Sequence, residues 1–459
     1  MTAPQAPAAG CRRPLAVDLF AGVGGLSLGC EQAGFDVVAA VEIDPIHAAA
    51  HRYNFPHCAV VARSVAGLSG EAIRRLAGIG DRPIDCVVGG PPCQGFSLMG
   101  QRMLDDPRNG LVRDYVRLVR ELAPAYFLFE NVKGLTLGRQ RAFLQELVET
   151  FGTAGYRIVA PWQVLNAAHY GVPQHRERLF LLGAREGLPL PEYPAPQTAI
   201  PGRRPVAAAL PLGPTCRDAL GDLPDAERFD RRLDGVCPAA DVWGLASDYA
   251  RALRGADRAS WHLGYRRRWD PALLTDSART DHTPISRRRF AATPPGRIEP
   301  VSRFFRLPAD GVCNTLRAGT DSARGAFTSP RPIHYALDRC ITVREMARLH
   351  GFPDWFRFHR TKWHGARQIG NAVPPPLARA LAARIVAALG LSPQPPATVI
   401  DPGDPELLAL EMSGAARYFG VEVPIGGRDR KSGARKRTQA QVEAQRLASI
   451  SQFASIEVP

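Results

Sequence analysis

The chain has 459 residues, 45% of them hydrophobic, so it is long enough for two or three domains with a sizeable core. Its net charge of +14 favours a polyanion as partner, and only four of its 58 basic residues are lysines, so codon bias explains the choice of arginine but not the sign of the charge. No apolar run reaches the roughly 18 residues of a membrane-spanning helix, and the nine cysteines show no Cys-x-x-Cys spacing. We therefore expect a soluble cytoplasmic protein with neither a zinc site nor a disulfide framework.

The first predicted strand begins near Val17 and passes through a glycine-rich turn, 20–25, into a helix over 26–33. This geometry brings a cofactor against a helix N-terminus. The next strand, 37–43, brings Glu42 and Asp44, which suit ribose hydroxyls or, alternatively, cap a helix that begins near Pro45. Ser27 stands where the dinucleotide fingerprint needs its last glycine, which disfavours a nicotinamide cofactor.

The next short apolar run, 84–88, is typical of a buried strand and leads into Gly-Gly-Pro-Pro-Cys. Pro91 and Pro92 restrict the backbone, so the thiol of Cys93 is presented in a rigid loop, as a nucleophile would be. The alternative is a buried structural cysteine, since free cysteine is among the most buried residue types. This segment alone does not decide between the two.

Two further predicted strands carry charged residues. The strand 126–132 ends in Glu130 and Asn131, and Arg176 and Arg178 lie on one face just before the strand 179–183. Each could be an ordinary strand-end or surface charge. Helices are predicted over 111–122 and 141–151, so the strand and helix alternation indicates a doubly wound α/β sheet.

Beyond residue 188 this alternation stops. Residues 189–214 are dense in proline, and 215–330 lack clear periodicity but carry the arginine triplets 266–268 and 287–289. Trp261, Trp269 and Phe290 interleave with these arginines, which fits phosphate contacts plus stacking or, alternatively, the core of a small domain. A helix and turn over 344–356 and a helix over 377–389 follow. The tail contains a basic run, 428–437, and a possible amphipathic helix over 439–453.

Taken in order, these motifs resemble the DNA (cytosine-5) methyltransferase family, bacterial type. The resemblance covers about residues 14–390 and rests on six motifs: Asp18-Leu19-Phe20-Ala21-Gly22-x-Gly24-Gly25, Pro91-Pro92-Cys93-Gln94, Glu130-Asn131-Val132, Gln174-x-Arg176-x-Arg178, Arg344-Glu345-x-x-Arg348-Leu349-x-Gly351-Phe352-Pro353 and Gly370-Asn371-Ala372-Val373-Pro374. There are two departures. Ser64 stands where the family usually has an acid that meets adenine, and Ala372 stands where many members have serine.

The resemblance implies methyl transfer from S-adenosyl-L-methionine to C5 of a cytosine that is flipped out of a specific duplex DNA sequence. Cys93 would add to C6 of the ring, Glu130 would bind or protonate N3, and Arg176 and Arg178 would hold the ring oxygen or a phosphate. The implied cofactor contacts are Phe20, Gly22, Gly24, Gly25, Glu42, Ile43, Pro91 and Asn371. The implied DNA contacts are Gln94, Ser97, Thr315 and Arg317. No metal is implied, and Asn131 is expected to orient the loop.

The expected organisation is an N-terminal tail (1–13), a Rossmann-like catalytic domain (14–188), a smaller target-recognition domain (189–356), a return segment (357–390) and a C-terminal extension (391–459), disordered or loosely docked. We expect a monomer that acts on double-stranded DNA, with a cognate restriction endonuclease as a candidate partner and no membrane contact. Two alternatives remain open: an RNA cytosine-5 methyltransferase, and a non-catalytic DNA-binding regulator on the same fold.

Overall fold

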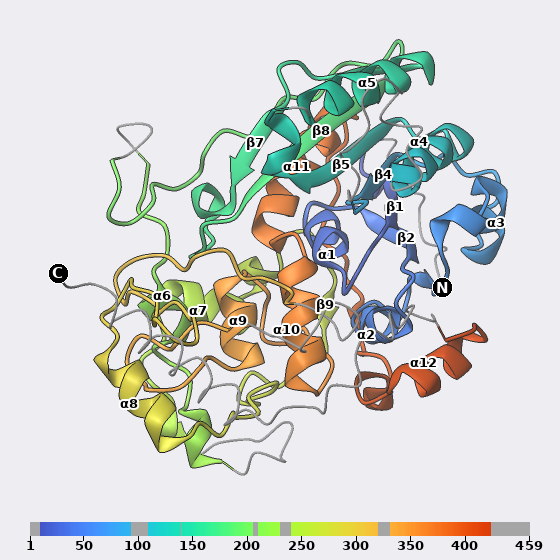
Figure 1. Ribbon diagram of the computed structural model, residues 1–459. Helices are drawn as coiled ribbons and strands as arrows, with labels where there is room; N and C mark the ends of the chain where they lie inside the picture. Colours follow the sequence, from blue (N-terminus) through green and yellow to red (C-terminus); the bar gives the residue numbers. More distant parts are fainter. Residues whose placement is uncertain are drawn as a thin grey trace, which may run out of the picture.

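A computed structural model describes residues 10–92, 109–138, 140–204, 210–229, 240–319 and 331–423. Within these residues an eight-stranded sheet has the order β3-β2-β1-β4-β5-β8-β6, and β7 also pairs with β8 (Figure 1). The strands are β1 (Leu15–Leu19), β2 (Asp36–Val41), β3 (Ala59–Val61), β4 (Cys86–Gly89), β5 (Tyr126–Val132), β6 (Tyr156–Ile158), β7 (Gln163–Asn166) and β8 (Glu177–Arg185). The run from β3 to β5 is parallel, whereas β8 is antiparallel to β5.

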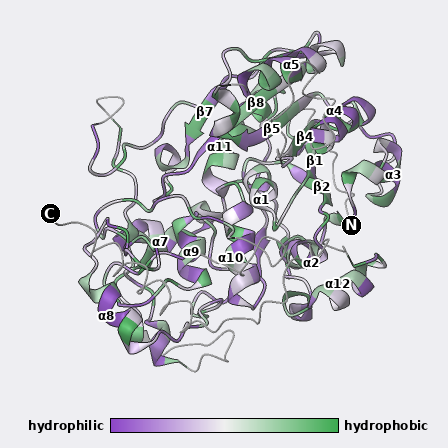
Figure 2. Cartoon of the chain, in the orientation of Figure 1, coloured by the Kyte–Doolittle hydropathy of each residue, from purple (hydrophilic) through white to green (hydrophobic). Residues whose placement is uncertain are grey.

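Helices cover both faces of this sheet because successive side chains of each strand point to opposite sides. In β1, Ala16 belongs to one hydrophobic cluster, and Val17 and Leu19 belong to the other. The first cluster includes α1 (Gly25–Gln32), α2 (Pro45–Asn54) and α11 (Pro375–Ala388); the second includes α3 (Gly70–Leu76), α4 (Gly110–Leu122) and α5 (Gln140–Thr153). Figure 2 shows β5 and β8 between these layers mainly in the hydrophobic colour. The predicted doubly wound α/β fold is confirmed.

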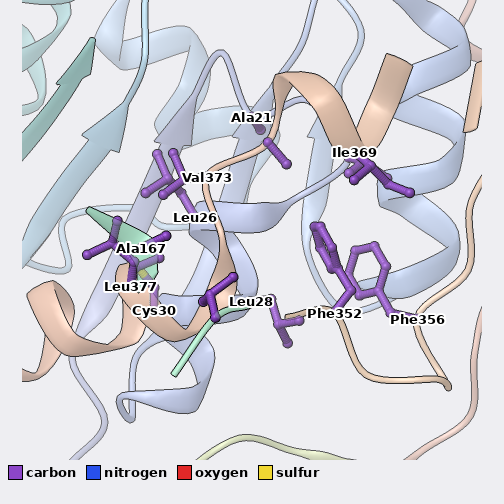
Figure 3. Close-up of a cluster of buried hydrophobic side chains, with 14 of the residues drawn as sticks. Ala21, Leu26, Leu28, Cys30, Ala167, Phe352, Phe356, Ile369, Val373 and Leu377 are labelled. Atoms are coloured by element: carbon purple, nitrogen blue, oxygen red, sulfur yellow. The ribbon is translucent and has the colours of Figure 1, made fainter. Parts of the chain in front are cut away.

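Helix α11 lies far along the chain from the strands, yet it packs directly on α1 beside the sheet. A Cβ atom added at Gly29 would lie 2.3 Å from the Cβ of Ala378, so the two helices approach as closely as glycine allows. Figure 3 shows Leu26 and Leu28 of α1 gathered with Val373 and Leu377 of the segment that enters α11. Helices from distant parts of the chain, α1 and α11, therefore share one hydrophobic core.

A second group of elements lies beside the sheet and is mainly helical (Figure 1). It comprises α6 (Cys216–Leu220), α7 (Asp248–Leu253), α8 (Pro284–Ala292), α9 (Val343–Leu349), α10 (Lys362–Asn371) and the short strand β9 (Arg266–Arg267). Arg348 of α9 is fully buried and pairs with Asp222 at 2.5 Å and with Asp354 at 2.7 Å. Buried charges of this kind are tolerated only when they are paired, so α9 fixes its neighbours in one arrangement.

The first part of the expected C-terminal extension differs from the prediction. Residues 391–423 include β10 (Val399–Ile400), which pairs with β9, and α12 (Met412–Phe419), which packs near α2. Leu407 and Leu408 are buried there. This part is therefore packed on the protein instead of being disordered, and apolar burial explains why. The basic run 428–437 and the helix expected over 439–453 lie outside the described residues.

Candidate active site

A cavity of about 750 Å³ opens at the carboxyl ends of the parallel strands, the edge where ligands bind in open α/β sheets. The turn after β1 contributes Phe20, Ala21 and Gly22, and the end of β2 contributes Glu42, Ile43 and Asp44. The remaining lining from the sheet comprises Gly90, Pro91, Pro92, Glu130, Asn131, Val132, Arg176 and Arg178. Its volume and its mixture of apolar walls with a few polar groups suit a ligand of nucleoside size.

The glycine-rich turn is shaped by backbone requirements. Gly24 has a φ of 106° and precedes α1, and a Cβ there would lie 2.5 Å from the ring of Phe55. A Cβ at Gly25 would lie 2.3 Å from the carbonyl oxygen of Val373. Gly22 and Gly25 line the cavity but Gly24 does not, so Gly24 contributes by its conformation. Phe20 also has a positive φ, 62°, a strained conformation of the kind that gathers at functional sites.

The carboxylate of Glu42 joins two of the strand ends. One oxygen accepts the backbone N–H of Gly22 at 2.8 Å, and the other accepts that of Asp44 at 2.9 Å. Burial raises the pKa of Glu42. Asp44 accepts the backbone N–H of Ile46 at 2.9 Å and therefore caps α2, so the capping alternative is confirmed for Asp44.

Glu130 lines the cavity beside the loop that leads toward Cys93. Its Oε1 is 3.0 Å from Nε of Arg178, and a Cβ at Gly90 would lie 2.5 Å from its other oxygen. Burial raises the pKa of Glu130, although Arg178 and Arg176 oppose this. A buried carboxyl with a raised pKa can carry a proton nearer neutral pH than an exposed one, which is what a proton donor needs.

Arg176 and Arg178 have different environments although the sequence presents them as a pair. The guanidinium of Arg176 is buried and donates to the carbonyls of Leu316 at 3.1 Å and Gly370 at 2.9 Å. Among the described residues its Nε has no hydrogen-bond partner. Burial, and then the neighbouring Arg178, lower the pKa of Arg176 to about 9. Arg176 therefore ties distant backbone segments to the cavity, whereas Arg178 holds the carboxylate.

The loop after β4 is described only up to Pro92. Asn131 Nδ2 donates to the carbonyl of Pro91 at 3.0 Å, so the prediction that Asn131 orients this loop is confirmed. Cys93, Gln94 and Ser97 lie outside the described residues.

The structure also describes Thr315 and Arg317, which were expected to contact DNA, and Asn371, which was expected to contact the cofactor. The hydroxyl of Thr315 donates to the carbonyl of His175 at 2.7 Å, and Arg317 is exposed. Asn371 is exposed at the end of α10 and lines the cavity, as does Ala372. Ser64 does not line the cavity; its hydroxyl caps the short turn 65–67 by accepting the N–H of Ala66 at 3.3 Å.

Five further lining residues escaped the sequence analysis: His47, Ala318, Gly319, Arg367 and Met412. His47 lies in the first turn of α2, three residues after Asp44, and could have been found as part of that helix end. Met412 lies outside the resemblance and had no sequence signal.

The arginine triplets require a correction. Arg267 is fully buried and pairs with Glu31 at 2.8 Å, and Arg268 pairs with Asp401 at 2.5 Å. Arg289 of the second triplet is 3.3 Å from Glu299. The prediction of phosphate contacts is therefore wrong for Arg267, because its charge is already balanced inside the protein.

The three aromatic residues near the triplets pack inside the protein, Trp261 and Trp269 in the main core and Phe290 in a smaller cluster. Trp261 is 9% exposed and stacks on Trp355 with ring centroids 5.7 Å apart, and Phe290 is 2% exposed. Trp269 packs against the same core as Trp261. The alternative that assigned these rings to packing is thus confirmed for all three.

The described residues provide neither a membrane-spanning helix nor a cluster of metal ligands. No helix among them is long and apolar enough to cross a bilayer. Nor do those residues contain a group of three or more His, Cys, Asp or Glu side chains arranged to hold a metal ion.

Comparisons with known proteins agree with these observations. Residues 16–387 match the family model described as C-5 cytosine-specific DNA methylase. Type II methyltransferase M.XorII of Xanthomonas oryzae pv. oryzae is 57% identical over 413 residues, which is 90% of this chain and 94% of that protein. Type II methyltransferase M.AgeI of Thalassovita gelatinovora is 33% identical, over 81% of this chain and 99% of its own length. A solved structure described as a DNA modification methyltransferase encoded within an E. coli prophage superimposes with a TM-score of 0.64, at 34% identity, over 82% of this chain and 99% of that one.

Proposed function

The chain belongs to the C-5 cytosine-specific DNA methylase family and is a DNA cytosine-5 methyltransferase, and from this premise we propose that it methylates a flipped cytosine in a specific duplex sequence through a covalent adduct of Cys93. Because its relatives are named type II methyltransferases, we also assign it to a restriction-modification system, beside a cognate endonuclease. It would act as a monomer.

One observation carries the mechanistic part of the proposal. The side chain of Glu130 is 14% exposed, and its carboxyl has a raised pKa and is held by Arg178 at 3.0 Å. It lines the same cavity as the glycine turn and as Pro91 and Pro92, which lead to Cys93. A proton donor, a cation and the loop that leads to the thiol of Cys93 therefore lie around one cavity of ligand size.

The reaction needs this set because cytosine C5 is a poor nucleophile. The Cys93 thiolate would form a bond to C6, and Glu130 would donate a hydrogen bond or proton at N3, so that the electrons of the C5–C6 double bond become available at C5. When bound, S-adenosyl-L-methionine supplies an electrophilic methyl group. Loss of the C5 proton and expulsion of the thiolate would then restore the ring and free Cys93.

The residues that would hold the cofactor are those that line the cavity near β1 and β2. They are Phe20, Gly22, Gly25, Glu42, Ile43, Pro91 and Asn371. The fit rests on the apolar walls from Phe20, Ile43 and Pro91 beside the carboxylate of Glu42, a combination suited to a nucleoside. Gly24 would act by holding the turn in shape. Gln94, Ser97, Thr315 and Arg317 are proposed DNA contacts, and the domain limits at residues 14, 188, 356 and 390 remain predictions.

The test is a covalent trap. Duplex DNA with 5-fluorocytosine at the methylated position, incubated with enzyme and cofactor, should yield a protein–DNA adduct stable on a denaturing gel, since fluorine cannot leave as a proton does. Cys93→Ala should abolish the adduct and labelled-methyl incorporation while leaving duplex binding largely in place. Cys11→Ala, which removes an exposed cysteine, is the matched control and should behave like the parent. Methyl transfer by Cys93→Ala, or no adduct with the parent, would contradict the mechanism.

A further inference from the structure

Residues 391–419 lie beyond the region that matches the family, which ends at residue 387, yet they pack against the sheet domain. The backbone N–H of Gly403 donates to the carbonyl of Tyr53, the penultimate residue of α2, at 2.8 Å. A Cβ at Gly403 would lie 2.9 Å from Cα of Tyr53, so the two backbones touch closely. Figure 1 shows α12 next to α2.

Two hydrogen bonds then fix the chain just before α12. The backbone N–H of Arg360 donates to the carbonyl of Leu408 at 3.0 Å, and Nε2 of His359 lies 3.1 Å from the carbonyl of Leu410. Because Nδ1 of His359 accepts the backbone N–H of Thr361 at 3.2 Å, the neutral ring carries its proton on Nε2 and donates it to Leu410. The position of the residues that follow is therefore set by the protein body.

Met412, the first residue of α12, is half-buried and lines the cavity, as do Ile43, Asp44 and His47. Helix α12 packs against α2, the helix that carries His47 and that Asp44 caps, so Met412 enters the cavity from this side. The lining includes no described residue of the segment after β3, where Ser64 replaces the acid that the resemblance would supply. An apolar, polarizable thioether is instead available on this side, and thioethers make favourable contacts with flat aromatic rings. In the proposed cofactor, adenine is the flat aromatic part.

We propose that Met412, presented by the C-terminal segment, completes the wall of the cofactor site that receives the adenine ring. This inference rests on the proposed function, because it takes S-adenosylmethionine as the ligand of the cavity. It makes residues 391–419 part of the cofactor site and Met412 a residue that sets cofactor affinity without taking part in the chemistry.

The experiment measures binding to the full chain by calorimetry, without DNA and without turnover. The probes are S-adenosylhomocysteine and 5′-methylthioadenosine, which share the adenine and ribose but differ in the amino-acid end. Met412→Ala should weaken both by about tenfold, which corresponds to about 1.4 kcal/mol. Met412→Leu keeps the volume and apolar character and should stay within about twofold of the parent. Tyr418→Ala, on the same helix but 54% exposed, is the matched control and should change neither affinity.

The possible outcomes separate the two proposals. If the parent binds both probes and Met412→Ala binds them as tightly, the inference is wrong while the proposed function stands. If Met412→Ala loses affinity only for S-adenosylhomocysteine, Met412 faces the amino-acid end and the adenine assignment is overturned. If the parent binds neither probe, the cofactor assignment fails and this inference falls with it. A melting temperature for Met412→Ala equal to that of the parent excludes misfolding as the cause of a lost affinity.

Discussion

Two opposing effects determine the pKa of Glu130. Burial raises its pKa, whereas Arg178 at 3.0 Å and the more distant Arg176 lower it. Burial prevails, so the protonated form persists to a higher pH than in an exposed glutamate. Since the proposed role requires that form, the rate of methyl transfer should fall as the pH rises through this raised pKa.

At this scale we predict that Glu130→Gln lowers the rate of methyl transfer by about 10²–10⁴-fold, the range for loss of a positioned proton donor. The affinity for S-adenosylhomocysteine should change far less. Labelled-methyl incorporation and calorimetry measure the two effects. Glu177→Gln, which removes an exposed carboxylate of the neighbouring strand β8 that pairs with Lys133, should leave the rate near that of the parent. Weakened cofactor binding with intact chemistry would mean that Glu130 is misassigned.

Single residues also show which contacts could not be predicted from the sequence. Arg176 and Arg178 are equivalent in the pattern, and only the fold reveals that the carbonyl partners of Arg176 come from Leu316 and Gly370. Those partners are 140 and 194 residues away along the chain, so no local pattern could indicate them. The proximity of Glu130 and Arg178 was easier to predict, because the two residues lie near the ends of the neighbouring strands β5 and β8.

Among the elements, α9 begins with a capping box that also anchors a buried ion pair. Thr342 accepts the N–H of Glu345 at 3.2 Å, and the Glu345 carboxylate accepts the N–H of Thr342 at 2.7 Å and pairs with Arg339 at 2.8 Å. Burial alone would raise the pKa of Glu345, but Arg339 and the backbone N–H lower it to about 2. The ionised form is therefore stabilised in the folded state.

We predict that Glu345→Gln lowers the free energy of unfolding by about 1.5–3 kcal/mol at pH 7. The variant removes the charged partner that accepts two hydrogen bonds from the buried guanidinium of Arg339, which then keeps, among the described residues, only its ion pair with Asp225 at 3.2 Å. The stabilisation by Glu345 is complete above its ordinary pKa of 4.5 and is lost as the pH falls toward 2. The difference between parent and variant should thus shrink by about 1 kcal/mol at pH 4, where the unfolded parent takes up the proton. Urea unfolding at the two pH values measures it. Glu71→Gln, at an exposed pair with Arg75, should have little effect at either pH.

Elements with strong local patterns were predictable. The strands β1, β2, β4, β5 and β8 and the helices α1, α4, α5 and α11 lie where apolar periodicity places them. The elements β9, β10 and α12 could not be predicted, because two-residue strands have no periodicity and α12 is held by contacts with α2. The same holds for Met412, whose place in the cavity depends on that packing.

At the scale of the whole molecule, the question is how a stacked base reaches a cavity at the edge of a sheet. The net charge of +14 attracts the duplex, but neither a thiol nor a methyl donor can reach C5 or C6 while the base remains in the helix. Flipping costs a few kcal/mol, less for a base that is already mispaired. The affinity should therefore depend on the state of the target pair.

We predict that 2-aminopurine at the target position brightens on binding, that a mismatched target binds more tightly than the paired one, and that the affinity falls steeply with salt. Fluorescence titrations at several salt concentrations test all three. The same probe placed several base pairs away is the control and should stay dim. No brightening at the target, together with no preference for the mismatch, would contradict flipping and favour a single-stranded or RNA substrate.

The contact between α1 and α11 also sets an order of events during synthesis. Gly29 leaves the ribosome long before Ala378, and at roughly 5–20 residues per second the intervening chain takes about 20–70 s to make. Throughout that interval the glycine face of α1 lacks its covering helix. A nascent chain that stalls before α11 has emerged would expose this apolar face, and with it the cysteine and leucine side chains that the finished protein shares between its two ends.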